Sequence, residues 1–243
     1  MANLEGKTAV VTGGAVHLGR AIVLAMADAG AQVAFTYLDS RGEAQQTLAE
    51  IKQRGGQGIV VQCDVRDRKS IAAAVETIQA QCGQIDILVN NAGFFETVGF
   101  NDMSEEQWDN MFAINVRGPF LMTRHCVAAL RSSHGRIINL GSLGGEKPWT
   151  THAHYCSSKA ALHMLSRVMA KALAPEIAVN CVAPGMMDQA TNDAATLQRF
   201  AGKTPMQRNG SPEDVVSAVM YFATAPHFIT GQILTVDGGL GLR

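Results

Sequence analysis

The sequence has almost no surplus of charge. Its 20 lysines and arginines stand against 21 aspartates and glutamates, which gives a formal net charge of −1 and a pI near 6.6. Proteins that bind nucleic acids or anionic membrane surfaces usually carry a strong excess of positive charge. No apolar run reaches the roughly 18 residues of a membrane span, and residues 1–7 hold no secretory stretch. We therefore expect neither nucleic acid nor a membrane as a partner.

Paired cysteines are also absent. The 5 cysteines form an odd set without a Cys-x-x-Cys motif, which indicates neither a disulfide framework nor a dithiol redox site. Reduced, mostly buried thiols are typical of a cytoplasmic protein, so we expect that location. We expect no metal, because the pair His152 and His154 has no acidic or cysteine partner at metal-binding spacing.

What the sequence does contain is a regular alternation of strand-like and helix-like segments over 243 residues, without a linker or repeat. This alternation predicts a single α/β domain over residues 1–243. The expected fold is doubly wound (Rossmann), with a seven-stranded, mostly parallel sheet and helices on both faces. Residues 186–210 have an irregular, polar pattern, and we expect them to form a lid. Strands are expected at residues 7–12, 32–37, 57–63, 85–89, 136–140, 178–182 and 232–236.

Glycines and polar residues directly follow several expected strands. The first strand runs into a glycine turn, Gly13 to Gly19, and then into a helix. In such a unit the helix N-terminus faces a pyrophosphate, and glycine lets the backbone approach it closely. Ligands of doubly wound sheets bind beyond the carboxyl ends of the strands. The residues that we expect to converge on one crevice there are Gly13, Asp64, Asn91, Ser142 and Pro184.

The stretch from Tyr155 to Lys159 begins an apolar-periodic segment, residues 154–173. Residues four apart share one face of a helix, so the tyrosine hydroxyl and the lysine ammonium point the same way. A free tyrosine titrates at about 10, and a nearby ammonium favours the phenolate. We therefore expect a lowered pKa for Tyr155, which would then act as general acid and base on a carbonyl or an alcohol.

With these motifs in this order, the whole chain resembles the short-chain dehydrogenase/reductase (SDR) family. Ser142 and Tyr155 stand thirteen residues apart, as they do in that family. Each motif alone is weak, but their combination is specific. The matching pieces are the turn from Thr12 to Gly19, Asp64-Val65, Asn90-Asn91-Ala92-Gly93, Asn115, Ser142, Tyr155 with Lys159, Pro184-Gly185, Thr230-Gly231-Gln232 and Asp237-Gly238-Gly239.

The resemblance implies an NAD(P)-dependent enzyme that acts on CH-OH and C=O groups. Tyr155 would exchange a proton with the substrate oxygen, which Ser142 would hydrogen-bond, and Lys159 would hold the nicotinamide ribose. The implied catalytic set is Asn115, Ser142, Tyr155 and Lys159, with Asn115 relaying protons towards the lysine. The implied cofactor-binding set is Gly13, His17, Leu18, Gly19, Tyr37, Ser40, Arg41, Asp64, Val65, Asn91, Ala92, Gly93, Tyr155, Lys159, Pro184, Gly185 and Met187.

Residues after the second expected strand bear on the choice of cofactor. NAD-specific relatives carry an acidic residue at position 37, which binds the adenosine ribose hydroxyls. This chain has Tyr37, followed by Ser40 and Arg41, which can bind a 2′-phosphate. Two residues favour NAD(H) instead. Asp39 adds a negative charge nearby, and Val16 stands where many NADP-dependent relatives carry arginine. We expect NADP(H) to be favoured over NAD(H).

Three cofactor positions keep a second interpretation. His17 replaces the usual glycine, and it is either an ordinary residue of a helix N-terminus or a side chain that reaches the cofactor phosphates. Gln189 stands where a threonine often holds the nicotinamide amide, so Gln189 or Thr191 would take that role. Asp64 is either a contact of the adenine or a plain strand terminator.

Aromatic and methionine side chains lie on the loops at the expected crevice. Loop placement favours a substrate pocket over a core. His152 and His154 would line the mouth of this pocket, or would be exposed loop histidines. The expected pocket residues are Phe94, Phe95, Trp149, His152 and Met186.

The general pattern is most similar to 3-oxoacyl-[acyl-carrier-protein] reductases. However, Ser132, Ser133 and Glu176 stand where those enzymes place basic residues for the carrier protein. Pteridine or dihydromonapterin reductases share the Phe94-Phe95 pair but usually carry aspartate at position 142, whereas serine suits a ketone or a secondary alcohol. A non-catalytic NADP(H)-binding sensor ranks last, because such relatives tend to lose the tyrosine or the lysine. The family also implies a homotetramer.

Overall fold

The computed structural model describes residues 3–188 and 193–242. Within them, one sheet has the strand order β3-β2-β1-β4-β5-β6-β7, and every neighbouring pair is parallel. The doubly wound α/β fold is confirmed, with a wholly rather than mostly parallel sheet. The strands are β1 (Thr8–Val11), β2 (Gln32–Tyr37), β3 (Gln57–Gln62), β4 (Ile87–Asn90), β5 (Arg136–Leu140), β6 (Ala178–Pro184) and β7 (Ile233–Val236). The helices are α1 (His17–Asp28), α2 (Arg41–Gln53), α3 (Arg68–Cys82), α4 (Glu105–Phe112), α5 (Gly118–Ser132), α6 (Ala153–Ala172), α7 (Ala194–Lys203) and α8 (Pro212–Thr224).

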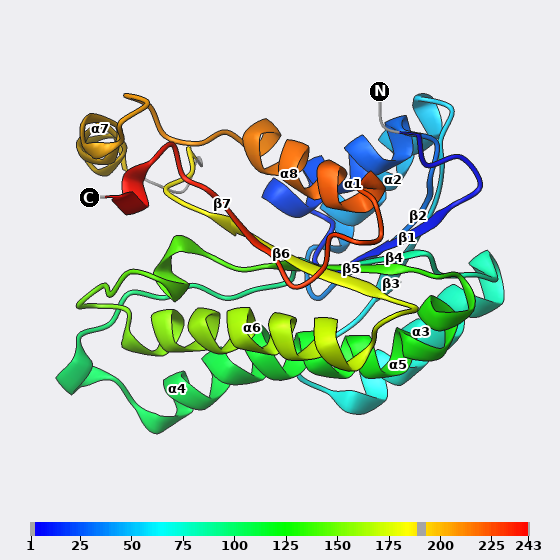
Figure 1. Cartoon of the computed structure of the whole chain (residues 1–243), viewed down its shortest axis with the longest axis horizontal. Coiled ribbons are helices and arrows are strands. Elements are labelled where there is room, and N and C mark those ends of the chain that lie inside the picture. Colours follow the sequence, from blue (N-terminus) through cyan, green and yellow to red (C-terminus); the bar gives the residue numbers. More distant parts are fainter. Residues whose placement is uncertain (1–2, 189–192, 243) are drawn as a thin grey trace.

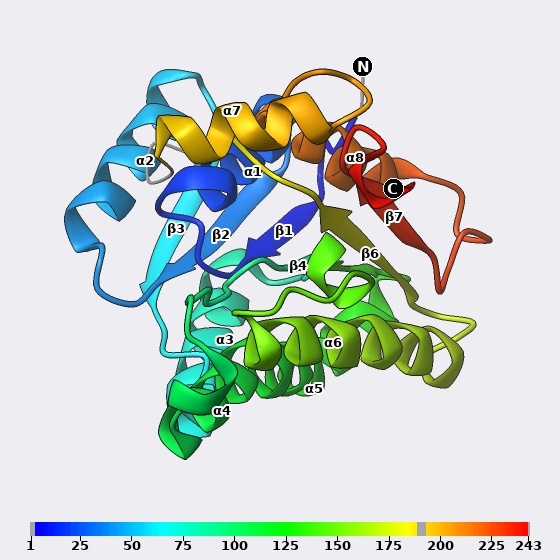
Figure 2. The same ribbon diagram turned by 90° about the vertical axis from the view of Figure 1, so that its left-hand side faces the viewer.

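Helices cover both faces of this sheet. Figures 1 and 2 show α1, α2 and α8 on one side and α3, α5 and α6 on the other. Successive residues of β1 serve the two cores in turn: Ala9 and Val11 pack in the core with α1 and α8, whereas Val10 packs in the core with α3 and α5. This alternation follows from the two-residue period of a strand. It explains why the buried strands read as continuous apolar runs.

The direction of the strand order reverses at β1, which pairs with both β2 and β4. The N–H of Thr12 donates to the carbonyl of Val89 at 3.0 Å, so the loops that follow β1 and β4 start side by side. Such a switch point opens a crevice at the carboxyl ends of the strands. The fold therefore places the glycine turn next to the segment from Asn91 to Gly93.

A chain of buried amides fastens α6 to the sheet. Asn90 on β4 donates through Nδ2 to Oδ1 of Asn139 on β5 at 2.8 Å. Asn139 in turn donates to the hydroxyl of Ser166 on α6 at 2.8 Å, and that hydroxyl donates to the carbonyl of Leu162 at 2.7 Å. Asn139 and Ser166 are almost fully buried. This chain fixes the helix that carries Tyr155 against the carboxyl ends of the central strands.

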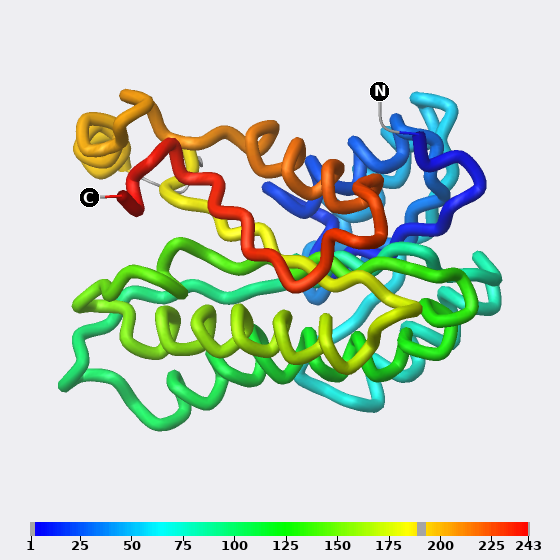
Figure 3. Tube along the Cα trace, viewed as in Figure 1, coloured from blue at the N-terminus to red at the C-terminus, as the bar shows by residue number. Residues whose placement is uncertain are grey.

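The expectation of an irregular segment over residues 186–210 is wrong in part, because α7 lies within it. Asp193 caps this helix by accepting the N–H of Thr196 at 2.8 Å. Leu197 and Phe200, three residues apart, share one half-buried face. Figure 3 shows the C-terminal segment returning beside α7, where the N–H of Met206 donates to the carbonyl of Gly238 at 3.2 Å.

None of the helices in the described ranges is long and apolar enough to cross a membrane.

Replacing Asn139 by alanine should destabilise the protein. The change leaves the buried polar groups of Asn90 and Ser166 without their partner, at about 1–3 kcal/mol each, so we expect a loss of roughly 2–4 kcal/mol in the free energy of unfolding. Urea unfolding measures this loss. The exposed Asn101→Ala change is the matched control and should cost less than about 0.5 kcal/mol. Equal stability of the two variants would contradict the role of the amide chain.

Candidate active site

Tyr155 and Lys159 lie in the first turns of α6, beside the end of β5. The ammonium nitrogen of Lys159 lies 5.8 Å from the centre of the Tyr155 ring and donates to the carbonyl of Leu140 at 2.8 Å. Ser142 lies two residues beyond Leu140, is buried, and lies close enough to Tyr155 for its side chain to lower the pKa of the tyrosine hydroxyl. The structure thus brings together the three side chains that the sequence selects for proton exchange with a substrate oxygen.

The pKa values of Tyr155 and Lys159 differ from the expectation of a lowered tyrosine pKa. Part of the Tyr155 side chain stays exposed, yet burial raises the pKa of its hydroxyl to about 12, against a smaller lowering by Ser142. Burial lowers the pKa of Lys159 to about 8. The expected lowering of the tyrosine pKa is therefore wrong in this structure. Desolvation is the largest cause of both shifts, because burial disfavours the charged form of each group.

Asn115 lies in a π-helical turn, Ala113–Arg117, just before α5. Its amide forms two hydrogen bonds with the main chain of Phe94: Oδ1 accepts the N–H at 2.8 Å, and Nδ2 donates to the carbonyl at 3.0 Å. Nδ2 also approaches the hydroxyl of Ser158 at 3.1 Å, and this hydroxyl donates to the carbonyl of Tyr155. π-Turns inside helices occur often at functional sites. Asn115 therefore joins the loop after β4 to the helix that carries Tyr155.

The glycine turn after β1 fits a dinucleotide. Gly13 has a φ of +64°, and Val16 precedes α1 without a side-chain cap, so N–H groups of the first helical turn have no capping side chain. A Cβ on Gly19 would collide with the carbonyl of Gly13 and lie 2.6 Å from Nδ2 of Asn91. Asn91 donates from that nitrogen to the carbonyls of Thr12 and Gly13 at 2.9 and 3.1 Å. The turn therefore admits no side chain at Gly19, and no side chain covers the backbone at the N-terminus of α1, to which an anion can bind.

His17 is the first residue of α1, is exposed, and has a φ of +50°. This left-handed conformation favours glycine, which explains why a glycine is the usual residue there. Leu18 is half-buried and packs against the core on the α1 side.

Tyr37, Ser40 and Arg41 lie where β2 passes into α2. Ser40 precedes the helix without capping it through its side chain, and Arg41 is exposed at the first helical position. Asp64, after β3, is bound by the Arg66 guanidinium at 2.8 Å, which holds the pKa of its carboxyl below the usual range. Arg66 was not among the residues predicted from the sequence, although it stands two residues after an aspartate at a strand end.

The remaining cofactor positions line the same edge of the sheet. Val65 is buried, and Gly118 packs so closely on it that a Cβ there would lie 3.2 Å from the valine. The N–H of Ala92 donates to the Thr12 hydroxyl at 2.9 Å. A Cβ on Gly93 would lie 3.7 Å from the Lys159 ammonium, so this glycine faces the lysine.

Pro184 ends β6, and a Cβ on Gly185 would lie 2.5 Å from that of Asp237. Met187 is buried and forms a bridge with Gly210. The expected roles of Gln189 and Thr191 lie outside the described residues.

Aromatic rings surround Tyr155. Phe95 meets the tyrosine ring edge-on at 4.8 Å and stacks on His152 at 4.8 Å, whereas Trp149 stacks on the tyrosine at 6.0 Å with planes 12° apart. The hydroxyls of Thr97 and Thr151 form hydrogen bonds with the two ring nitrogens of His152, both at 3.0 Å, and these bonds tie the loops together. The main chain of Phe94 is hydrogen-bonded to the amide of Asn115. Met186 is half-buried, and its carbonyl accepts the N–H of Gly210.

His154 does not line the pocket mouth and is not exposed, so both expectations for this residue are wrong. It lies inside α6, fully buried, with Nε2 3.5 Å from the carboxylate of Glu96. Glu96 is in turn bound by Gln107 of α4 at 3.0 Å. The residue before Tyr155 faces the protein interior because the helix already begins at Ala153.

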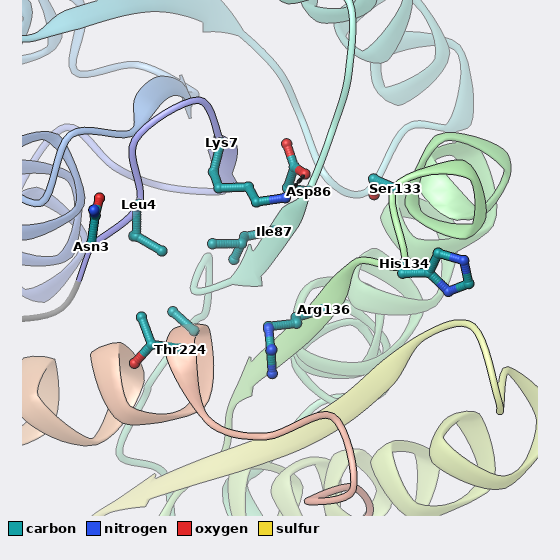
Figure 4. A pocket seen from close by; sticks show the side chains of 10 residues that line it. Asn3, Leu4, Lys7, Asp86, Ile87, Ser133, His134, Arg136 and Thr224 are labelled. Carbon is teal, nitrogen blue, oxygen red and sulfur yellow. Dashed lines mark hydrogen bonds and ion pairs between the residues drawn. The ribbon is translucent and has the colours of Figure 1, made fainter.

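A hollow of about 220 Å³ lies away from this crevice. Figure 4 shows it at the amino ends of β4 and β5, with Lys7 pointing at Asp86, to which it is bonded at 2.9 Å. It contains none of the residues expected to bind cofactor or substrate. The chemistry is therefore assigned to the opposite edge of the sheet, where the sequence-selected side chains meet.

Comparisons with known proteins identify the family of the chain. A family model described as "Enoyl-(Acyl carrier protein) reductase" matches residues 14–241. A 3-oxoacyl-[acyl-carrier-protein] reductase of Synechocystis is 33% identical over 99% of both chains. A dehydrogenase/reductase structure from Sinorhizobium meliloti has 36% identity and a TM-score of 0.94, covering 98% of this chain and 96% of that one. A gluconate 5-dehydrogenase from Burkholderia cenocepacia, in complex with NADP and tartrate, has 28% identity and a TM-score of 0.93, covering 99% and 97%.

Fold, site and relatives define an oxidoreductase of the doubly wound class. The chain belongs to the short-chain dehydrogenase/reductase family. The sequence expectation of family and enzyme class is confirmed.

Lys159→Met should change how stability depends on pH. Burial holds the pKa of Lys159 near 8 in the folded protein, below its ordinary 10.5. Between these values the unfolded chain binds more protons, so the stability of the parent rises with pH there. We expect the parent-minus-variant difference in unfolding free energy to increase by roughly 2–3 kcal/mol between about pH 7 and pH 10.5. Urea unfolding without cofactor measures it, with the exposed Lys171→Met as matched control; a difference that stays flat would contradict the burial argument.

Proposed function

We propose that the protein is an NADP(H)-dependent oxidoreductase that interconverts a ketone and a secondary alcohol. The observation that carries this proposal is the meeting of Ser142, Tyr155 and Lys159 beside a turn that fits a dinucleotide. A bound nicotinamide supplies or accepts the hydride. The Ser142 hydroxyl hydrogen-bonds the substrate oxygen, where negative charge develops during reduction. Tyr155 donates its proton to that oxygen in reduction and takes it back in oxidation.

The charge state of the site suits reduction. A tyrosine whose pKa is raised to about 12 keeps its proton at neutral pH. It can release this proton to an alkoxide, which is a much stronger base than a phenolate. Lys159 then favours the phenolate that forms, through its charge. Asn115 would help to relay a proton back towards Lys159. It lies in its π-helical turn on the other side of Gly93 from the lysine.

Three observations support NADP(H) over NAD(H). Position 37 carries tyrosine instead of an acidic residue, and the Ser40 hydroxyl does not cap α2. Arg41 presents an exposed guanidinium at the same helix N-terminus, which suits a 2′-phosphate. Asp39 would oppose the phosphate, and Arg66, which lies close enough to feel the charge of Asp39, is already paired with Asp64.

Arg41→Met should weaken the use of NADPH selectively. Loss of a charged bond to the 2′-phosphate should lower kcat/KM for NADPH by roughly tenfold or more and leave NADH almost unchanged. Steady-state kinetics with both cofactors measure this. Arg68→Met, at the exposed first position of α3, is the matched control. A parent enzyme that prefers NADH would refute the cofactor assignment.

The substrate is proposed to be a ketone with an apolar substituent, as in 3-oxoacyl compounds. Phe95, His152 and Trp149 surround Tyr155 with rings, and Phe95 leaves 55% of its surface exposed for a ligand. The relative from Synechocystis is a 3-oxoacyl-[acyl-carrier-protein] reductase. Ser132 and Ser133, in place of basic residues, argue against the carrier protein as partner.

Phe95→Ala should reduce activity towards ketones with a ring or a long acyl chain more than towards small ones. Loss of the ring contact should lower kcat/KM for an aryl ketone by roughly tenfold and for acetone by much less. Phe228→Ala, at a fully exposed phenylalanine, is the matched control. Parallel losses for both ketones would remove Phe95 from the pocket.

Two other functions are separated by one substrate screen. A dihydropterin reductase is less favoured, because Ser142 offers a hydroxyl suited to a ketone oxygen. A sensor that only binds NADP(H) is least favoured, because Tyr155 and Lys159 are both present. Nicotinamide absorbance with ketones, 3-oxoacyl thioesters and dihydropterins distinguishes the three: turnover only with dihydropterins favours the second, and tight NADPH binding without turnover favours the third.

A homotetramer is proposed from the family resemblance and from exposed apolar side chains on two helices that lie on one face of the sheet. Phe120 of α5 is 40% exposed, and Met164 and Val168 of α6 are 56% and 55% exposed. A row of such side chains marks an interaction surface.

A further inference from the structure

A buried histidine lies behind Ser142, and the chemistry above does not use it. His163 follows Lys159 by about one turn of α6 and is 4% exposed. Its Nε2 accepts the main-chain N–H of Ser142 at 3.4 Å. The ring packs between Gly141 and Gly145: a Cβ on the first would collide with Nε2, and a Cβ on the second would lie 2.7 Å from Cε1. The imidazole thus occupies space that side chains on either side of Ser142 would need.

The surroundings of His163 keep it an acceptor. An imidazole that accepts an N–H at Nε2 is neutral and carries its proton on Nδ1. Burial, followed by the charges of Lys159 and Arg167 on either side along α6, lowers the pKa of His163 to about 4. A protonated ring would place a second buried positive charge beside Lys159. At neutral pH the ring is therefore neutral.

Ser142 is held from two sides. Its main chain is held by His163, and its Oγ accepts the N–H of Gly144 at 3.1 Å. The same side chain lies close enough to Tyr155 to lower the pKa of its hydroxyl. Any movement of the Ser142 main chain would carry the hydroxyl away from Tyr155 and from the substrate oxygen that both groups are proposed to contact.

We propose that His163 is a positioning residue, which holds the Ser142 hydroxyl in register with Tyr155 by accepting the Ser142 N–H. This role rests on the proposed function, because His163 acts only through Ser142. The sequence carried a signal for it: position 163 is four residues after Lys159, on the same face of the helix. Displacing a reacting group by about 1 Å can cost a hundredfold in rate.

Two substitutions of similar bulk test this proposal. His163→Gln can place an amide oxygen near the position of Nε2, whereas His163→Met offers only a weak acceptor. We expect the methionine variant to lose about ten- to a hundredfold in kcat, and the glutamine variant to stay within about threefold of the parent. The dissociation constant for NADPH should be unchanged in both. Equal kcat losses in two folded variants, or none in either, would overturn the proposal.

A double-mutant cycle with Ser142→Ala separates positioning from general packing. If His163 acts through Ser142, His163→Met should cause no further loss in the Ser142→Ala background. Additive losses would overturn the proposal. If the methionine variant does not fold, His163→Asn takes its place, because its shorter amide does not reach the Ser142 N–H. Failure here would leave the dependence on Tyr155 intact, which distinguishes it from failure of the proposed function.

Discussion

The burial of the Lys159 ammonium beside Tyr155 is the constraint on which the rest of this structure depends. An ammonium out of water is unfavourable, and here the main chain at the end of β5 compensates it in part through the Leu140 carbonyl, 2.8 Å away. The remaining cost of burying charge lowers the pKa of Lys159 and raises the pKa of Tyr155. Both shifts favour the neutral forms. At neutral pH Lys159, with a pKa of about 8, still carries its charge, and Tyr155 holds its proton until a stronger base forms beside it.

Such a pair needs a rigid support, and the fold provides it from several directions. The amide chain through Asn139 and Ser166 fastens α6 to the central strands. Asn115 joins the same helix to the loop after β4 through Ser158, and His163 fills the space behind Ser142. The partners of α6 and of the Ser142 loop in these contacts come from β5, from the turn before α5 and from α6 itself. A parallel sheet makes this possible, because the carboxyl ends of all its strands meet at one edge.

Local and periodic signals allowed the fold to be predicted. β2 and β5 have the expected bounds. The α7 helix was missed, because its apolar face is short and lies in a polar segment. The positions after the strand ends could also be predicted, since a residue that follows a parallel strand must lie at the binding edge.

What the sequence could not provide is the environment of each side chain. The pKa of Tyr155 depends on how much water the fold removes, and spacing to Lys159 says nothing about that. His154 and His152 are two residues apart, but one is fully buried and the other bridges two pocket loops. His17 departs from a glycine position, and only the structure shows the left-handed backbone that it must adopt.

The most direct test of the central claim is the single-turnover rate of carbonyl reduction by Tyr155→Phe, with NADPH bound and the best ketone present. The change removes the proton donor and keeps the ring that packs against Phe95 and Trp149. Loss of a general acid should lower this rate by about a hundred- to ten-thousandfold, with NADPH affinity unchanged. A variant that reduces the ketone at the rate of the parent would contradict the account.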